Sequence, residues 1–369
     1  MKILEIANVD FSLRQFVLPL MRAAREAGHE VIGVSADGPL LADLRAEGFR
    51  VETIPFARTL SPGAHLAAFL ALRRLIRAER PGMVHAHMPI SGFLSRLAAR
   101  SLGVERIAYT CHGFLFKQEG SRARRAVAFV MEWLGGRLTD VFLTVSAEEA
   151  ADARRLRIFA RPKAVGNGRD PARFRPDPAA RARLRAELGT PDGRVVILAV
   201  SRLVRTKGYS ELAAAMRAVP EAELWVVGER LASDPGPDMV ALLDAAGLGA
   251  RLRRLGYRAD MPAVMAAADI FTLPSYFEGL PVSVIEAMLC GLPVVASDIP
   301  GPREQVIDGE TGRLVPAHDV AALAGALSAL VADAGLRARM GGAGRVRAAA
   351  LFDERKVIAR TLDLLGLGV

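Results

Sequence analysis

Short apolar runs alternate with amphipathic stretches along almost the whole chain, and this alternation most limits the possible fold. KILEIANV, VIGVSAD, MVHAHM and RIAYTCHG each have strand character, and helical patterns separate them. Strands joined by crossover helices pair in parallel, so the pattern predicts a doubly wound parallel sheet. The pattern stops near residue 168 and restarts at RVVILAVSRL. The sequence therefore predicts an α/β protein with two Rossmann-like domains, residues 1–168 and 169–351.

The charge of the chain is concentrated in its first half. The 369 residues carry a net charge of +9, and residues 1–166 contain 24 Lys and Arg against 16 Asp and Glu. The remaining residues contain 25 against 24. This excess predicts an anionic partner for the first domain, either a phosphorylated acceptor or an anionic membrane surface. Nucleic acid is not expected, because no helix-turn-helix, zinc-finger or aromatic RNA-binding signature is present.

Cysteine content and hydropathy indicate where the protein works. Cys111 and Cys290 stand beside apolar residues in different halves, so we expect two buried thiols, no disulfide and a reducing compartment. Neither a signal peptide nor an apolar run of ~18 residues is evident. We therefore expect a cytoplasmic protein. The stretch Lys117–Arg137 has a basic start and an apolar continuation, and either contacts the inner face of the cell membrane or packs as an ordinary helix.

The stretch Tyr276–Ser297, YFEGLPVSVIEAMLCGLPVVAS, predicts a turn, a short helix and a buried strand. Pro281 suits the first turn of the helix, and Gly291 stops it. Free N–H groups at a helix N-terminus bind phosphate. Glu278 stands at the mouth of this helix and Glu286 about one turn inside, where carboxylates can accept hydrogen bonds from sugar or ribose hydroxyls. The stretch predicts a nucleotide-sugar pocket; the alternative is a loop carboxylate and a solvated helix residue.

Two basic residues follow the first strand of the second domain. Arg202 lies at the strand end, and Lys207 comes directly before Gly208 and a helix. An arginine grips phosphate through two N–H groups, and a lysine supplies a point charge. The pair could converge on one diphosphate, or could pair with surface acids. The spacing is not that of a Walker A loop.

Polar residues also follow strands of the first domain, where ligands of such sheets bind. Asn8 and Arg14 bound a loop after the first strand that contains no glycine. His87 is near the end of one strand, and His112 follows another strand directly before Gly113. A structural histidine is the alternative for His87.

The segments FEG, GLP, EAM and GLPVVAS, with two glutamates eight positions apart, resemble the E-x7-E region of retaining family 4 glycosyltransferases. The SRL…KG pattern and the GNG turn before an aspartate and an aromatic residue are similar to the same family. The resemblance implies a GT-B fold, in which two Rossmann-like domains face a cleft. It implies a hexosyltransferase whose first domain binds the acceptor and whose second binds the nucleotide sugar. It also implies that a last helix, residues 352–369, crosses back to the first domain.

The resemblance assigns roles to individual residues. Two cations neutralise the diphosphate, Glu286 holds the ribose, Glu278 contacts the donor sugar, and a histidine lies near the scissile bond. The implied catalytic residues are His112, Arg202, Lys207 and Glu278. The implied donor-binding residues are Arg202, Lys207, Gly256, Glu278, Gly279, Leu280, Val282 and Glu286. Weaker acceptor or interdomain candidates are Asn8, Arg14, His87, Asn167 and Asp170.

The chemistry is expected to need no metal and no cofactor, because we find neither an Asp-x-Asp pair nor a His/Cys cluster. The stretches HAHMPISGFLSRLAAR and YTCHGFLF look like those of bacterial enzymes that build lipid-linked surface glycans. That resemblance implies a UDP-sugar donor of a hexose or N-acetylhexosamine and a polyprenyl-diphosphate-linked acceptor. The alternatives are a GDP-mannose-dependent mannosyltransferase, a GT-B-fold UDP-sugar epimerase and a non-catalytic sensor of sugar nucleotides.

Overall fold

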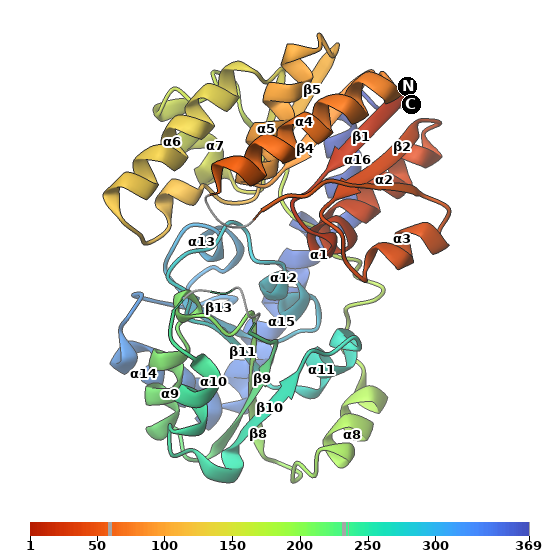
Figure 1. Cartoon of the computed structure of the whole chain (residues 1–369). Coiled ribbons are helices and arrows are strands. Elements are labelled where there is room, and N and C mark those ends of the chain that lie inside the picture. Colours follow the sequence, from red (N-terminus) through yellow and green to blue (C-terminus); the bar gives the residue numbers. More distant parts are fainter. Residues whose placement is uncertain (58–60, 231–233, 235, 369) are drawn as a thin grey trace. The chain divides into compact units, whose positions relative to one another are not determined.

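The computed structural model describes residues 1–57, 61–230, 234 and 236–368, which form two compact units. Unit 1 contains Met1–Gly166 and Val357–Val369, and unit 2 contains Asn167–Lys356 (Figure 1). The chain leaves unit 1 inside the GNG turn, close to the predicted boundary at residue 168. It returns at Val357, inside the helix α16 (Glu354–Leu365), which falls within the predicted last helix, residues 352–369.

Unit 1 is built on a seven-stranded sheet in which every strand pair is parallel. The strand order is β3-β2-β1-β4-β5-β6-β7, so the direction of winding reverses between β1 and β4. Ligands of doubly wound sheets bind at such a reversal, beyond the carboxyl ends of the strands. The strands are β1 (Lys2–Ile6), β2 (Glu30–Ser35), β3 (Arg50–Thr53), β4 (Met83–His87), β5 (Arg106–Cys111), β6 (Val141–Thr144) and β7 (Lys163–Ala164).

Helices cover both faces of this sheet with apolar side chains, and Figure 1 shows α16 among the elements of unit 1. The segment from Asn8 to Arg14, expected to be a loop, is helical from Asp10 onward, where α1 leads directly into a π-helical segment and then into α2. The helical elements are α1 (Asp10–Ser12), η1 (Leu13–Val17), α2 (Leu18–Glu26), α3 (Leu41–Ala46), α4 (Pro62–Glu79), α5 (Pro89–Ser101), η2 (Leu115–Lys117), α6 (Arg122–Arg137), α7 (Ala147–Arg155) and α16 (Glu354–Leu365).

Unit 2 repeats the same winding with six parallel strands in the order β10-β9-β8-β11-β12-β13. The reversal here lies between β8 and β11. Most of these strands are buried on both faces, which explains their continuous apolar sequences. The strands are β8 (Val195–Val200), β9 (Ala222–Val227), β10 (Leu252–Gly256), β11 (Ile270–Leu273), β12 (Val294–Ser297) and β13 (Gly312–Val315).

The helices of unit 2 include a close backbone contact. A Cβ on Gly341 would lie 1.9 Å from the carbonyl oxygen of Gly291, so α15 touches the end of α12 backbone to backbone. The described residues after β13 form three helices, of which the last, α16, lies mostly in unit 1. The elements are α8 (Pro178–Glu187), η3 (Arg205–Lys207), α9 (Tyr209–Arg217), α10 (Met239–Asp244), η4 (Gly249–Arg251), α11 (Met261–Ala267), α12 (Val282–Leu289), α13 (Pro302–Gln305), α14 (Val320–Ala332) and α15 (Ala334–Leu351).

Within the described ranges, no single helix is long and apolar enough to cross a membrane. The pair α14 and α15 meets the length and composition requirement together, with a bend of 104° between the helices. Their apolar residues, among them Leu323, Leu327 and Met340, are buried in the core of unit 2. Cys111 and Cys290 are buried free thiols, as predicted.

Candidate functional site

Two of the predicted catalytic residues meet at the carboxyl end of the unit 2 sheet. Lys207 ends the short helix η3 after β8, and Glu278 follows β11, so the two flank the reversal of strand order. The Lys207 Nζ donates to Glu278 Oε1 over 2.6 Å. The side chains are 19% and 10% exposed, so this ion pair is largely shielded from water.

Glycines hold the surrounding loops in close contact. A Cβ on Gly208 would lie 2.0 Å from the Pro274 carbonyl oxygen, and one on Gly301 would lie 2.2 Å from the Gly279 carbonyl oxygen. Both glycines have positive φ, +72° and +91°, which disfavours other residues. The loops after β8, β11 and β12 are therefore fixed against one another by backbone contacts that no side chain could replace.

Helix α12 spans Val282–Leu289, the predicted VSVIEAML segment, with Pro281 as its N-cap. No side chain caps this end through a hydrogen bond. The Gln305 Nε2 donates to the Pro281 carbonyl over 2.9 Å, whereas its buried Oε1 and the buried Ser275 Oγ have no partner among the described residues. Buried polar atoms without partners are costly. The open helix end and these atoms are therefore suited to a polar ligand.

Glu286 is buried inside α12, so the alternative of a solvated helix residue is wrong. Arg169 donates from Nε to Glu286 Oε1 over 2.7 Å. Burial raises the pKa of Glu286, and the charge and hydrogen bond of Arg169 oppose that rise. Asn167 donates from Nδ2 to the Leu280 carbonyl over 2.7 Å, which ties it to the loop before α12. Sequence reasoning missed Arg169, although it follows the GNG turn that was singled out.

The other unit 2 candidates lie around these loops. Arg202 donates from Nη1 to Asp234 Oδ1 over 2.6 Å, and its side chain is 58% exposed. Gly256 is the last residue of β10, and its carbonyl accepts from the Gly228 N–H. Asp170 stabilises its own turn, because its carboxylate accepts from the Ala172 N–H.

The first loop of unit 1 is organised by a helix rather than by glycine. Arg14 lies in the π-helical segment and pairs through Nε with Asp43 on α3. Asn8 follows β1, and its buried Oδ1 has no partner among the described residues. Arg14, predicted to contact the acceptor substrate, already has its side chain paired with a carboxylate. The Asn8 Oδ1, in contrast, is available to accept a hydrogen bond from a ligand.

A buried network that the sequence did not predict crosses the reversal point of the unit 1 sheet. Glu5 Oε2 on β1 lies 2.9 Å from His87 Nε2 on β4, and Glu5 Oε1 lies 3.1 Å from His85 Nδ1. His87 Nδ1 lies 3.1 Å from His112 Nε2, and His85 Nε2 lies 2.8 Å from Thr110 Oγ1. Glu5 and His85 are fully buried, His87 is 3% exposed, and His112 is partly exposed.

This burial changes the titration of the network. Burial alone would raise the pKa of Glu5, but the charge and hydrogen bond of His85 and the bond to His87 outweigh it and lower that pKa to about 2. Burial, followed by repulsion from His85, lowers the pKa of His87 to about 4. Burial and the neighbouring histidines also hold the pKa of His112 well below its usual value. His87 therefore lies behind His112, and both ring nitrogens of His87 are hydrogen-bonded within the network. Direct contact between His87 and the acceptor substrate is not favoured.

The expectation that the chain lacks a metal-ligating cluster needs correction. One ligand atom each from Glu5, His85 and His87 lies within 4.8 Å of the others, a set of donors that suits Zn²⁺. In the described structure these atoms are already satisfied by hydrogen bonds with one another. Metal binding would require both histidines to give up the protons that face Glu5.

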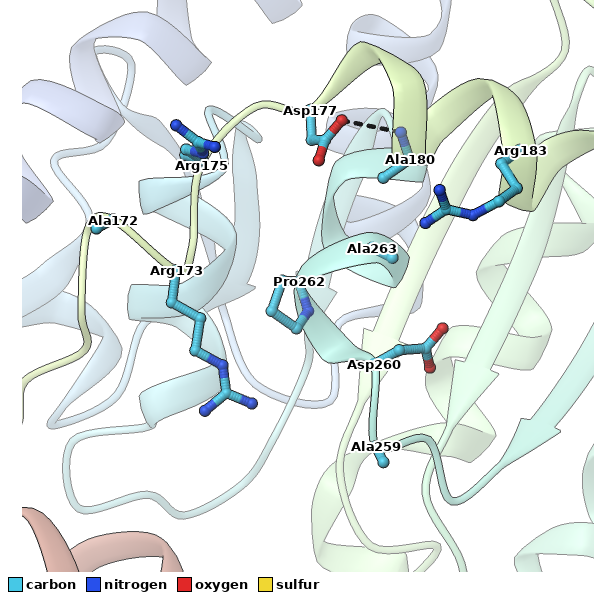
Figure 2. A pocket seen from close by; sticks show the side chains of 10 residues that line it. All are labelled: Ala172, Arg173, Arg175, Asp177, Ala180, Arg183, Ala259, Asp260, Pro262 and Ala263. Carbon is cyan, nitrogen blue, oxygen red and sulfur yellow. Dashed lines mark hydrogen bonds between the residues drawn. The ribbon is translucent and has the colours of Figure 1, made fainter.

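A hollow of about 420 Å³ opens beside α8 and α11 in unit 2, and Figure 2 shows its lining. Arg173, Arg175 and Arg183 reach into this region, and the Asp177 carboxylate caps α8 by accepting from the Ala180 N–H. None of the predicted site residues lines this hollow. The donor-binding hypothesis therefore rests on the strand ends described above.

Comparison with known proteins identifies the family. The profile described as "Glycosyltransferase Family 4" matches residues 14–173, and that described as "Glycosyl transferases group 1" matches residues 180–347. The chain is 30% identical over 376 residues to EpsD of Bacillus subtilis, which is named as a glycosyltransferase; the alignment covers 98% of this chain and 96% of that one. The chain belongs to glycosyltransferase family 4. The predicted family and the predicted enzyme class, a hexosyltransferase, are confirmed.

One further relative of this glycosyltransferase and one solved structure of similar fold are informative. It is 28% identical to the Escherichia coli protein named UDP-Gal:alpha-D-GlcNAc-diphosphoundecaprenol alpha-1,3-galactosyltransferase, over 80% of this chain and 78% of that one. The structure of Anabaena HepE in complex with UDP and glucose superposes with a TM-score of 0.84 at 23% identity, covering 99% of both chains. The predicted GT-B fold is thereby confirmed.

Proposed function

We propose that this family 4 glycosyltransferase transfers a hexose or N-acetylhexosamine from a UDP-sugar to a polyprenyl-diphosphate-linked glycan. We further propose retention at the anomeric carbon and independence from metal. The observation that carries the donor half is the shielded Lys207–Glu278 pair beside the open end of α12. The printed name of the Escherichia coli relative supports the donor and acceptor classes.

The donor diphosphate is assigned to the strand ends of unit 2. Lys207 has three N–H donors, so it can keep its bond to Glu278 and still donate to a phosphate oxygen. Arg202 is exposed and supplies a second cation. Glu286, oriented by Arg169, is assigned to the ribose hydroxyls. Backbone N–H groups complete the site, from Gly279, Leu280 and Val282.

The proposed reaction is a same-face displacement. A bond forms between the acceptor oxygen and the anomeric carbon, and the bond between that carbon and the β-phosphate oxygen breaks. The proton of the acceptor hydroxyl passes to the departing phosphate, so the products are the glycoside and UDP. Negative charge builds on the leaving UDP, and prearranged cations and amides stabilise it. Glu278 in unit 2 is assigned to the sugar that is transferred, and His112 in unit 1 is assigned to a hydroxyl of the sugar substrate.

A direct assay tests this proposal. The protein is incubated with a UDP-hexose, a UDP-N-acetylhexosamine or GDP-mannose, together with a polyprenyl-diphosphate-linked sugar and EDTA. We expect UDP release and an elongated lipid product. Lys207→Ala should abolish turnover, and the exposed Lys356→Ala is the matched control. Turnover with GDP-mannose alone, or a new UDP-sugar epimer without UDP release, would refute the proposed donor or reaction.

The anionic membrane surface is assigned to α6. Val127, Val130 and Leu134 are 51%, 50% and 42% exposed and recur at helical spacing, so they form one apolar stripe. Exposed arginines, such as Arg122 and Arg124, lie at the start of the same helix. Basic amphipathic helices bind anionic lipid surfaces in this way.

Co-sedimentation with phosphatidylglycerol vesicles tests the α6 assignment. Replacing the three stripe residues, Val127, Val130 and Leu134, with serine should release the protein from the vesicles. Val346→Ser in unit 2, where the side chain is 73% exposed, is the control and should not affect binding. Equal binding of both variants would rule out α6 as the membrane contact.

A further inference from the structure

Five polar side chains form one continuous hydrogen-bonded chain at the point where the unit 1 sheet reverses its winding. The chain runs from Thr110 through His85, Glu5 and His87 to His112, with successive distances of 2.8, 3.1, 2.9 and 3.1 Å. Its members come from β1, β4, β5 and the residue after β5. Only its last member, His112, is exposed enough to meet a substrate.

The positions of the protons along this hydrogen-bonded chain depend on its one carboxylate, Glu5. An ionised carboxylate only accepts hydrogen bonds, so the proton between Glu5 and His87 belongs to His87 Nε2. A single carboxylate compensates one positive charge, and further imidazolium charge in a buried chain would be uncompensated. Burial and repulsion from His85 keep His87 neutral, because they lower its pKa to about 4. A neutral His87 with its proton on Nε2 accepts at Nδ1, so its neighbour, His112 Nε2, must donate. A neutral His112 then carries no proton on Nδ1.

We propose that Glu5 and His87 are positioning residues, which hold His112 in the Nε2-protonated tautomer so that its Nδ1 accepts a hydrogen bond from a hydroxyl of the sugar substrate. The contact with sugar rests on the function proposed above, whereas the tautomer does not. A site that accepts from a hydroxyl rejects an analogue without that hydroxyl, because the acceptor is left unpaired. His112 would thus select sugar substrates with a free hydroxyl at one position.

Three variants separate this role from a purely structural one. His87→Leu removes the link between Glu5 and His112. His87→Gln retains it, because the amide nitrogen can donate to Glu5 while the amide oxygen accepts from His112. Thr110→Val cuts the other end of the same chain, at a site that is 5% exposed, and leaves the His87 branch intact.

The first measurement is the ¹⁵N spectrum of the histidine rings in the unliganded full-length protein, with His112 assigned by its loss in His112→Asn. We expect a protonated, pyrrole-type Nε2 and an unprotonated, pyridine-type Nδ1. His87→Leu should mix the two tautomers, whereas His87→Gln and Thr110→Val should preserve the original one. Protonation at Nδ1 in the unmodified protein, or an unchanged tautomer in His87→Leu, would overturn the proposal. So would one equivalent of zinc bound through His87 in the isolated protein.

The second measurement is turnover of the UDP-sugar that the protein accepts. His87→Leu should lower kcat by about ten-fold or more, Thr110→Val should change it by less than about two-fold, and His87→Gln should recover most of the loss. Equal losses in His87→Leu and Thr110→Val would show a structural role only. Full activity of His112→Asn would refute the contact with sugar. Absence of turnover with every donor would instead count against the proposed function, and the ¹⁵N spectrum would still decide the positioning role.

Discussion

Unit 1 should lose stability in mild acid because it buries a neutral histidine. The pKa of His87 falls from 6.5 to about 4 on folding, first because of burial and then because of repulsion from His85. The unfolded chain therefore binds a proton below about pH 6.5 that the folded chain refuses until about pH 4. The stabilisation of the folded state by the neutral, buried His87 is fully present above about pH 6.5 and is lost as the pH falls towards 4. At pH 5 the loss amounts to about 2 kcal/mol.

His87→Gln tests this magnitude. The variants are compared in a Trp225→Phe background, so that Trp133 on α6 alone reports urea unfolding of unit 1. Between pH 7.5 and pH 5.0, the parent should lose about 2 kcal/mol more than His87→Gln. Thr110→Val removes no titratable group and should keep the parental pH dependence. Glu5 contributes little to the pH dependence of stability in this window. Its lowered pKa stabilises the folded state, and that stabilisation is lost only below about pH 4.5. The same pH dependence in the parent and in His87→Gln would refute the reasoning.

Three further predictions concern other parts of the fold. Gly208→Ala should cost at least about 1–2 kcal/mol in urea unfolding, because of its positive φ, and should weaken UDP binding measured by calorimetry, because its Cβ would collide with the loop after β11. Arg96→Leu should lower the free energy of unfolding by about 3–5 kcal/mol, because it leaves the buried Glu132 without its cation. Cys111 and Cys290 should not react with a thiol reagent in the native protein and should both react in urea, because both are buried.

The parts of the site that the sequence predicted well are those with local markers. Helix α12 was predicted over Val282–Leu289 because Pro281 and Gly291 mark its two ends. The neighbourhood of Lys207 and Glu278 followed from their positions after strands of a doubly wound sheet. Residues that start or stop a helix, and residues that directly follow a strand, can be identified from the sequence alone. Both features could therefore be derived without a structure.

The parts that were missed depend on distant partners. Glu5 is an acidic residue inside an apolar strand, and its histidine partners are 80 and 82 positions away. The Arg169–Glu286 pair spans 117 positions. The segment after β1 was expected to be a loop, but buried contacts of Leu13 and Val17 hold it helical. Such outcomes follow from strand register and packing, which a single sequence does not reveal.

The contact between Gly341 and Gly291 has a consequence for mutational mapping of this enzyme. Helix α12 is only about 12 Å long, so its two ends move together. Any side chain at position 341 would collide with Gly291 at the C-terminal end of the helix. The collision would also shift the N-terminal end, which is assigned to the donor. A loss-of-function variant at Gly341 would then lower donor affinity without touching the donor. Screens that map activity onto sequence would place position 341 in the substrate site, although its effect travels through the rigid length of α12.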